Sequence, residues 1–333
     1  MAKKQRLLIK RIMWVFIPAV LVFGLGVFLI EAYTTYRLTR PPRTALYGSP
    51  HDFQMILQKP IWFDEKWRDA DGSQSVGWIM SQGKTAPGII LSHGYGSNRS
   101  ELLSLSFELW KAGYNVLVYD LRGQGESPVQ WSGLGTYEKE DILSAIDYLK
   151  GLKTDGGQPL LDGRLGLYGV EMGGYASLLA AAQSTLVKAV AVDSTYTDIP
   201  DYLNYRMKLS VGNSSALSRL IDAPVVGNLT NLSVNLYLRR NEEAETAAQA
   251  VKVKSDRKTL FIAGADSGAL GKMTKDLYAG CAGPKELAVV AKSRLNRLYE
   301  KESQDYDVKV VSFFVDALPP VVVDAAQPPE ASK

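Results

Sequence analysis

Histidine and cysteine are nearly absent from this chain of 333 residues, which contains two histidines and one cysteine. The single cysteine, Cys281, excludes an internal disulfide and any metal site built from several thiolates. The two histidines, His51 and His93, both lie in the first third of the sequence. The C-terminal half of the chain therefore contains no histidine that could act as a catalytic base.

Outside the N-terminus, the chain also lacks a large excess of positive or negative charge. Residues 1–43 carry eight lysines and arginines against Glu31, a net charge of +7. The overall charge is +3, so the remaining 290 residues sum to −4. A mildly acidic body lacks the basic surface that is typical of nucleic-acid binding, and we expect no nucleic-acid partner.

One long uncharged run is present, from Ile12 to Ile30, and its 19 residues suffice to cross the hydrocarbon core of a bilayer as a helix. A cleaved signal peptide and a buried core helix are the alternatives. However, the run is longer than the apolar part of a usual signal peptide, and no small-residue cleavage motif follows it. We therefore predict a transmembrane anchor over residues 12–31, which makes the lipid bilayer a partner of this protein.

The charges that flank the run predict its orientation. Five cations precede it within a basic tail, residues 1–11, and three follow it. Cytoplasmic flanks of membrane helices are enriched in lysine and arginine. We therefore expect a single-pass protein with its N-terminus in the cytoplasm and its body outside.

Beyond the anchor, residues 32–50 form a polar linker, and the body extends over residues 51–318. The predicted strands are 60–68, 75–81, 88–92, 115–119, 165–168, 187–192, 259–263 and 286–291, and the predicted helices are 101–112, 137–149, 174–183, 271–281 and 306–318. Alternating strands and helices predict an α/β fold with a mostly parallel, doubly wound sheet and a crevice at the strands' carboxyl ends. A mostly helical insertion over about 197–256 interrupts the alternation, and residues 319–333 form a tail that we expect to be disordered.

The most informative segment is Gly169-Val170-Glu171-Met172-Gly173-Gly174. A predicted strand runs into it and a predicted helix leaves it. This is the context of the G-x-S-x-G turn, which presents a nucleophilic serine. Glu171 stands where that serine would be. The sequence keeps the turn and lacks its nucleophile.

Four loops at predicted carboxyl ends of strands carry motifs that belong together: His93–Asn98, Asp120–Ser127, Gly169–Gly174 and Gly264–Asp266. In this order and spacing they resemble the α/β-hydrolase superfamily, and within it membrane-anchored bacterial serine hydrolases of the esterase and acyl-peptidase-like kind. The resemblance covers about residues 50–318. It implies an α/β-hydrolase fold with a helical cap insertion and a family activity on ester or amide bonds.

The resemblance also implies roles for individual positions. The backbone N–H groups of Tyr95 and Met172 would form the oxyanion hole, and Asp266 would be the acid of the triad. Glu171 replaces the nucleophilic serine, and the histidine position falls at about Leu295. The triad is therefore degenerate at two of three positions, and we expect no cofactor and no metal ion.

Three other roles are less well supported by the residues. Glu171 could attack as a carboxylate, but the resulting ester would need a base for its hydrolysis, and glutamate reaches about one methylene further than aspartate. His93 could act as a substitute base, although turn geometry beside the oxyanion loop explains it equally. Glu171, Asp193 and Asp266 could hold a hard cation, but such oxygen clusters are usually hydrogen-bonded structure.

Three cations, Lys292, Arg294 and Arg297, lie in the loop that lacks its histidine. We expect Glu171 to enter the oxyanion hole and to pair with Arg294 or Arg297, unless these cations are ordinary solvated loop charges. The sequence then predicts a non-catalytic hydrolase-fold protein that binds an unidentified small-molecule or protein ligand at the membrane. An active hydrolase with an atypical site and a purely structural envelope protein are the alternatives.

Overall fold

The computed structural model describes residues 2–50, 62–212, 214–239, 245–253, 255–295 and 300–320. The chain divides into two compact units, one of residues 1–39 with 199–244 and one of residues 40–198 with 245–333. Three features named above, His51, Arg297 and the tail from residue 321 onwards, lie outside the described residues.

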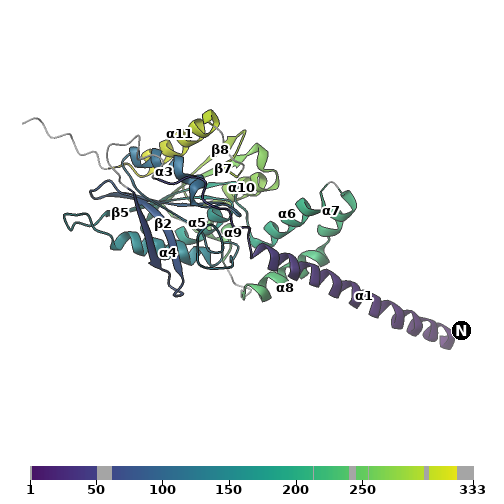
Figure 1. The fold of residues 1–333 in the computed structure, drawn as a ribbon. Helices are drawn as coiled ribbons and strands as arrows, with labels where there is room; N and C mark the ends of the chain where they lie inside the picture. The colour runs from purple at the N-terminus through teal and green to yellow at the C-terminus, as the bar shows by residue number, and fades with distance from the viewer. Residues whose placement is uncertain are drawn as a thin grey trace, which may run out of the picture. The chain divides into compact units, whose positions relative to one another are not determined.

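An eight-stranded sheet forms the centre of the second unit, in the order β1-β2-β4-β3-β5-β6-β7-β8 (Figure 1). The strands are β1 (Trp62–Arg68), β2 (Gln74–Met80), β3 (Ala86–Ser92), β4 (Asn115–Tyr119), β5 (Leu161–Val170), β6 (Val187–Asp193), β7 (Lys258–Gly264) and β8 (Lys285–Val290). β1 and β2 form a hairpin, β2 is also antiparallel to β4, and the other neighbours are parallel. The mostly parallel sheet predicted from the sequence is confirmed.

Helices cover both faces of this sheet, which explains why β3 and β4 are apolar and buried along their whole length. α3 (Leu103–Lys111) and α11 (Glu300–Ala317) lie on one face, and α4 (Glu138–Gly151) and α5 (Met172–Gln183) on the other (Figure 1). The core under α3 and α11 joins Ile89 and Leu91 of β3 to Leu105 and Phe314 of these helices. A short α9 (Ala247–Ala250) precedes β7, and η2 (Ala265–Ser267) and α10 (Ala269–Gly280) follow it.

The parallel order gathers four loops at one edge of the sheet. β3, β5, β6 and β7 are neighbours in that region and end at Ser92, Val170, Asp193 and Gly264. Because parallel strands share the direction of their carboxyl ends, the segments that follow them meet there. The predicted oxyanion loop, elbow and acid are thereby brought to the same edge of the sheet.

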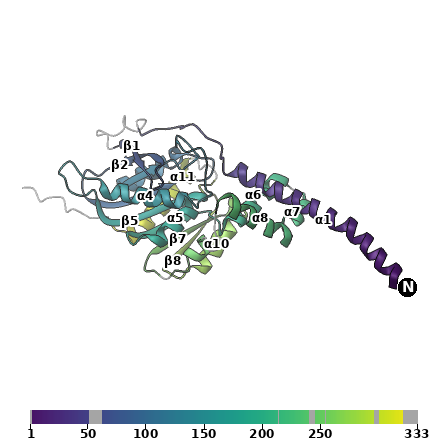
Figure 2. The same cartoon turned by 90° about the horizontal axis from the view of Figure 1, so that it is seen from below.

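The first unit is helical and contains α1 (Ala2–Leu38), α6 (Ile199–Val211), α7 (Ser215–Ile221) and α8 (Pro224–Tyr237) (Figure 2). Within α1, Met13–Leu38 is long and apolar enough to cross a membrane, with a mean hydropathy of 2.6. A signal sequence satisfies the same criterion. The described residues therefore contain one candidate membrane helix, near the N-terminus. α6 to α8 lie in the insertion expected between the sheet's later strands.

Candidate functional site

The turn between β5 and α5 is as sharp as a nucleophile elbow requires. Glu171 has φ of 50° and ψ of −108°, a conformation that few non-glycine residues adopt. An added Cβ would lie 2.3 Å from the Gly173 carbonyl oxygen at Gly169, and 2.4 Å from the Ser92 carbonyl oxygen at Gly173. The two glycines of the motif are thus needed for close backbone contacts, and they hold Glu171 buried at the apex.

β6 and the loop after it fix the backbone of Glu171. Its N–H donates to the Asp193 carbonyl oxygen at 2.8 Å, and its carbonyl oxygen accepts from the Thr195 hydroxyl at 2.8 Å. These long-range bonds hold the strained backbone in place. The surrounding structure therefore maintains the strained conformation of Glu171, as expected at a site where the position of a side chain matters.

The Glu171 side chain reaches the loop after β3. Its Oε2 accepts a hydrogen bond from the Tyr95 backbone N–H at 2.9 Å. Tyr95 is one of the two positions to which the resemblance assigns an oxyanion-hole donor. Met172, the other position, is the first residue of α5 and is buried. The protein's own carboxylate thus occupies one donor, beside a helix N-terminus that favours an anion.

His93 is held by the backbone on both sides of its ring. Nδ1 lies 2.8 Å from the Gly94 carbonyl oxygen, and Nε2 accepts from the Leu121 N–H at 3.1 Å. This pattern requires a neutral ring with its proton on Nδ1, and burial lowers the pKa of His93. Because both nitrogens are engaged, the ring orders the turn and is not available as a substitute base.

The acid position keeps a contact with the loop after β8. Oδ1 of Asp266 accepts from the backbone N–H and from the hydroxyl of Ser293, both at 3.0 Å. Leu295, at the predicted histidine position, is partly buried and packs against the core beneath α3 and α11. Asp266 thus holds this loop through Ser293, and neither Ser293 nor Leu295 carries a group that could act as the missing base.

Arg294 does not take the role predicted for it. Its guanidinium is buried and forms an ion pair with the Asp307 carboxylate of α11. The guanidinium also donates to the backbone carbonyl oxygen of Glu101 at 3.3 Å. The prediction that Arg294 pairs with Glu171 is therefore wrong, because a buried carboxylate on a helix packed against the loop binds it instead. Arg297, the other candidate, lies outside the described residues.

Asp193, at the carboxyl end of β6, anchors the same loop. It accepts hydrogen bonds from the Arg294 backbone N–H at 2.7 Å, the Tyr306 hydroxyl at 2.6 Å and the Ser194 hydroxyl at 2.8 Å. Burial raises the pKa of Asp193 in spite of these bonds. In the described part of the chain, no three histidine, cysteine or carboxylate side chains form a group able to hold a metal ion. Asp193 is structural here, and the cation site considered from the sequence has no such group to support it.

Glu101 is a residue of this site that sequence reasoning missed, since no motif marks it. It lies in the η1 turn (Arg99–Leu102) after the Tyr95 loop and accepts a short hydrogen bond from the Ser97 hydroxyl. Burial, with a smaller contribution from Glu171, raises the pKa of Glu101 to about 7. A second carboxyl group therefore lies within the electrostatic influence of Glu171.

The raised pKa of Glu101 predicts a pH-dependent stability. A carboxyl group whose pKa is higher in the folded state stabilises the fold below its unfolded pKa, and this contribution is lost as the pH rises towards 7. Relative to Glu101→Gln, the wild-type protein should lose roughly 3 kcal/mol between pH 4.5 and pH 8. Thermal melts of both proteins at several pH values test this. Glu108→Gln, at an exposed ion pair with Lys111, is the control, and parallel pH profiles of wild type and Glu101→Gln would contradict the assignment.

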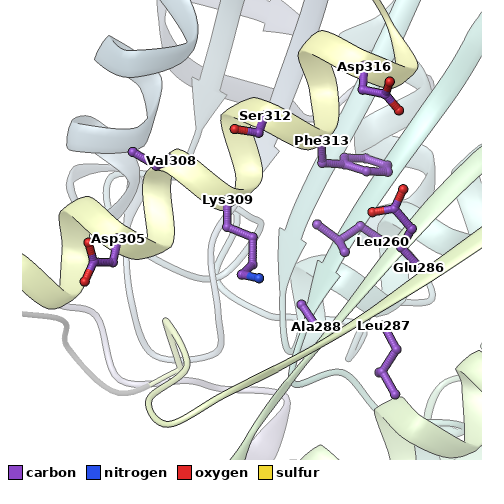
Figure 3. A pocket seen from close by; sticks show the side chains of 10 residues that line it. All are labelled: Leu260, Glu286, Leu287, Ala288, Asp305, Val308, Lys309, Ser312, Phe313 and Asp316. Atoms are coloured by element: carbon purple, nitrogen blue, oxygen red, sulfur yellow. The ribbon is translucent and has the colours of Figure 1, made fainter.

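A separate groove of about 580 Å³ lies between α11 and the edge of the sheet (Figure 3). Leu260, Ala288 and Phe313 form its apolar floor, and Glu286 and Lys309 are among the charged residues at its rim. None of the residues that line it belongs to the elbow, the Tyr95 loop or the Asp266 turn. We therefore do not assign this groove to the predicted site.

The model of one protein family matches most of the sheet domain. Residues 68–272 match the X-Pro dipeptidyl-peptidase (S15) family, from the end of β1 into α10. The match includes the elbow, the Tyr95 loop and Asp266. It ends before the loop around Leu295, where the histidine is missing.

Two sequence relatives and one solved structure are similar to this chain. The chain is 29% identical to the uncharacterized protein YqkD of Bacillus subtilis (strain 168), over 74% of this chain and 77% of that protein. It is 28% identical to the polyketide transferase ATR5 of Stachybotrys chlorohalonatus, over 48% of this chain and 54% of the transferase. The structure of the Pyrococcus furiosus esterase Pf2001 aligns with a TM-score of 0.60 at 17% identity, covering 84% of this chain and 98% of the esterase. The esterase comparison shows a shared α/β-hydrolase fold.

Proposed function

Because the chain belongs to the X-Pro dipeptidyl-peptidase (S15) family of α/β hydrolases, we propose that it is a membrane-anchored pseudo-hydrolase. In this proposal it binds a small molecule or a protein partner at its crevice and does not turn over an ester or amide bond. The hydrogen bond from the Tyr95 N–H to the Glu171 carboxylate carries the proposal.

That hydrogen bond opposes acyl transfer for an electrostatic reason. An oxyanion hole accelerates the reaction because its donors meet a negative charge that develops only in the transition state. At Tyr95 the donor already binds a full carboxylate, which a substrate carbonyl oxygen would have to displace. The serine hydroxyl and a histidine base are missing as well, so three parts of the reaction machinery are absent or occupied.

The retained elbow supports a binding role for the crevice. A non-glycine residue in the Glu171 conformation costs roughly 1–3 kcal/mol. Gly169 and Gly173 still provide the close contacts that this conformation needs. A site without any role would gain stability by losing this strain, and its presence favours a crevice that still recognises a ligand.

An active hydrolase with an atypical site is the second candidate, and Glu101 is the observation that favours it. Its pKa of about 7 suits a general acid or base near neutral pH. Family membership also points to ester or amide bonds. In this alternative the Glu101→Gln variant loses activity that the wild-type protein possesses, whereas the pseudo-hydrolase has no activity to lose.

A fluorophosphonate probe tests the proposal at the position of the nucleophile. The purified full-length protein should not be labelled under conditions that label an intact serine hydrolase, because Glu171 offers no serine oxygen. An active esterase of the same fold is the positive control. Labelling of the wild-type protein at a serine in this crevice would overturn the pseudo-hydrolase.

The orientation of the membrane anchor gives a separate prediction. Because five cations precede the uncharged run and three follow it, the N-terminus should be cytoplasmic and the hydrolase-like domain should lie outside. A C-terminal alkaline phosphatase fusion in a bacterial host should therefore be active. A green fluorescent protein fusion at the same junction should be dark, and a bright fusion with inactive phosphatase would reverse the orientation.

A further inference from the structure

The helical unit has its own internal packing, in which α8 lies along the C-terminal part of α1 (Figures 1 and 2). The hydroxyls of Thr35 and Ser233 are 3.3 Å apart, and the Thr39 hydroxyl donates to the Tyr237 hydroxyl at 3.3 Å. The second pair lies four residues further along the chain than the first, both at α1 and in α8. The two helices therefore run in the same direction.

This register brings the start of α8 beside the apolar run of α1. Pro224 precedes Ser233 by nine residues, about 14 Å of helix, which places it roughly level with Gly26. Burial along α1 agrees with this estimate, because residues 20–23 are exposed whereas Val27 and Phe28 are partly covered. The first turns of α8 thus lie beside residues of the uncharged run from Ile12 to Ile30.

α8 also covers the one carboxylate of α1. Glu31 is 1% exposed, and Thr230 of α8 is a neighbour of its carboxyl group. A charged side chain that faces lipid is costly, and such residues in membrane proteins normally face protein instead. The position of α8 is the one that shields Glu31 from a surrounding bilayer.

The outward surfaces of α7 and α8 carry several large apolar side chains, beside exposed polar residues such as Asn228 and Asn231. Large apolar side chains there are between 43% and 62% exposed: Leu217, Leu220, Val225, Leu232 and Leu236. No residue of α7 is buried. Arg219 and Asp222 are the only charged residues in the segment 215–237, and Asp222 is paired with Lys208 of α6 at 2.5 Å. A soluble protein rarely leaves such a surface to water.

We propose that α7 and the first turns of α8, residues 215–229, are immersed in the bilayer beside α1 and form a second lipid contact of the protein. The inference rests on α1 being the membrane anchor proposed above. Lipid is the occupant that the structure favours, because the exposed surface is continuous with the uncovered apolar face of α1, where Leu25 and Leu29 are also exposed. Helices with few charged residues and several exposed large apolar side chains favour the apolar part of a bilayer over water.

Depth-dependent quenching tests this in the full-length protein. Single cysteines at Leu220, Val225, Val22 and Lys150 are introduced in a Cys281→Ala background and labelled with an environment-sensitive fluorophore. The proteins are placed in vesicles of phosphatidylcholine and phosphatidylglycerol, with and without brominated acyl chains. Val22, which is 70% exposed on α1, reports the anchor, and the exposed Lys150 reports the sheet domain. Labels at Leu220 and Val225 should be quenched at least half as strongly as the label at Val22, and the label at Lys150 should not be quenched.

Three other outcomes separate the possible failures. Quenching at Val22 alone, with iodide quenching at Leu220 and Val225, would leave the anchor in place and overturn the immersed segment. If the labels at Leu220 and Val225 were protected from both brominated lipid and iodide, their surface would be covered by a protein partner or a second copy. That result would also overturn the immersed segment. No quenching at Val22 would remove the anchor itself and the premise with it.

Discussion

The purified full-length protein should hydrolyse p-nitrophenyl esters no faster than its Glu171→Ala variant. In serine hydrolases, removal of the nucleophile or the base costs roughly six orders of magnitude in kcat and leaves only about 10³–10⁴-fold acceleration over water. Here the serine position holds Glu171 and the expected histidine position holds Leu295. The Tyr95 donor, which could supply part of the residual rate, is bonded to the Glu171 carboxylate.

Initial rates with p-nitrophenyl butyrate, measured in the same detergent for wild type, Glu171→Ala and Glu101→Gln, make this test quantitative. The three rates should agree within error. Multiple turnovers by the wild-type protein that vanish in either variant would contradict the pseudo-hydrolase. Loss in Glu101→Gln alone would identify the acid–base group of the atypical hydrolase, because burial raises the pKa of Glu101 to about 7 within the electrostatic influence of Glu171.

The sheet was predictable because its central strands are buried on both faces and are apolar without interruption. Prediction failed where an element begins in polar sequence. β5 starts at Leu161, four residues before the predicted strand, since its partly exposed start contains Asp162 and Arg164. α11 begins at Glu300, six residues before the predicted helix, where polar residues give no apolar period.

The elbow was predictable for a different reason, which is that strand, turn and helix are contiguous in the sequence. The partner of Arg294 was not, because it depends on how α11 packs against the loop. Arg294 donates from its backbone to Asp193, which lies 101 residues away, and pairs through its side chain with Asp307. Such contacts come from tertiary packing, and a cluster of loop cations does not reveal which carboxylate each one binds.

Replacing Arg294 with methionine should destabilise the fold by about 3–5 kcal/mol. The guanidinium is buried against the Asp307 carboxylate and lies 4.9 Å above the Tyr306 ring, so its loss leaves a buried carboxylate without its counter-ion. Thermal unfolding of the full-length protein should shift down by roughly 10 °C. Lys272→Ala, at an exposed ion pair with Asp276, is the control and should shift it by about 1 °C or less.

The double variant Arg294→Met, Asp307→Leu separates the ion pair from simple loss of packing. Removal of both charges avoids an unpaired buried carboxylate, so the double variant should recover at least about 2 kcal/mol relative to Arg294→Met alone. The defect of Arg294→Met should also shrink as the pH falls, because burial already raises the pKa of Asp307 and removal of the cation raises it further. An Arg294→Met defect that is small, independent of pH and additive with Asp307→Leu would show that Arg294 contributes packing alone.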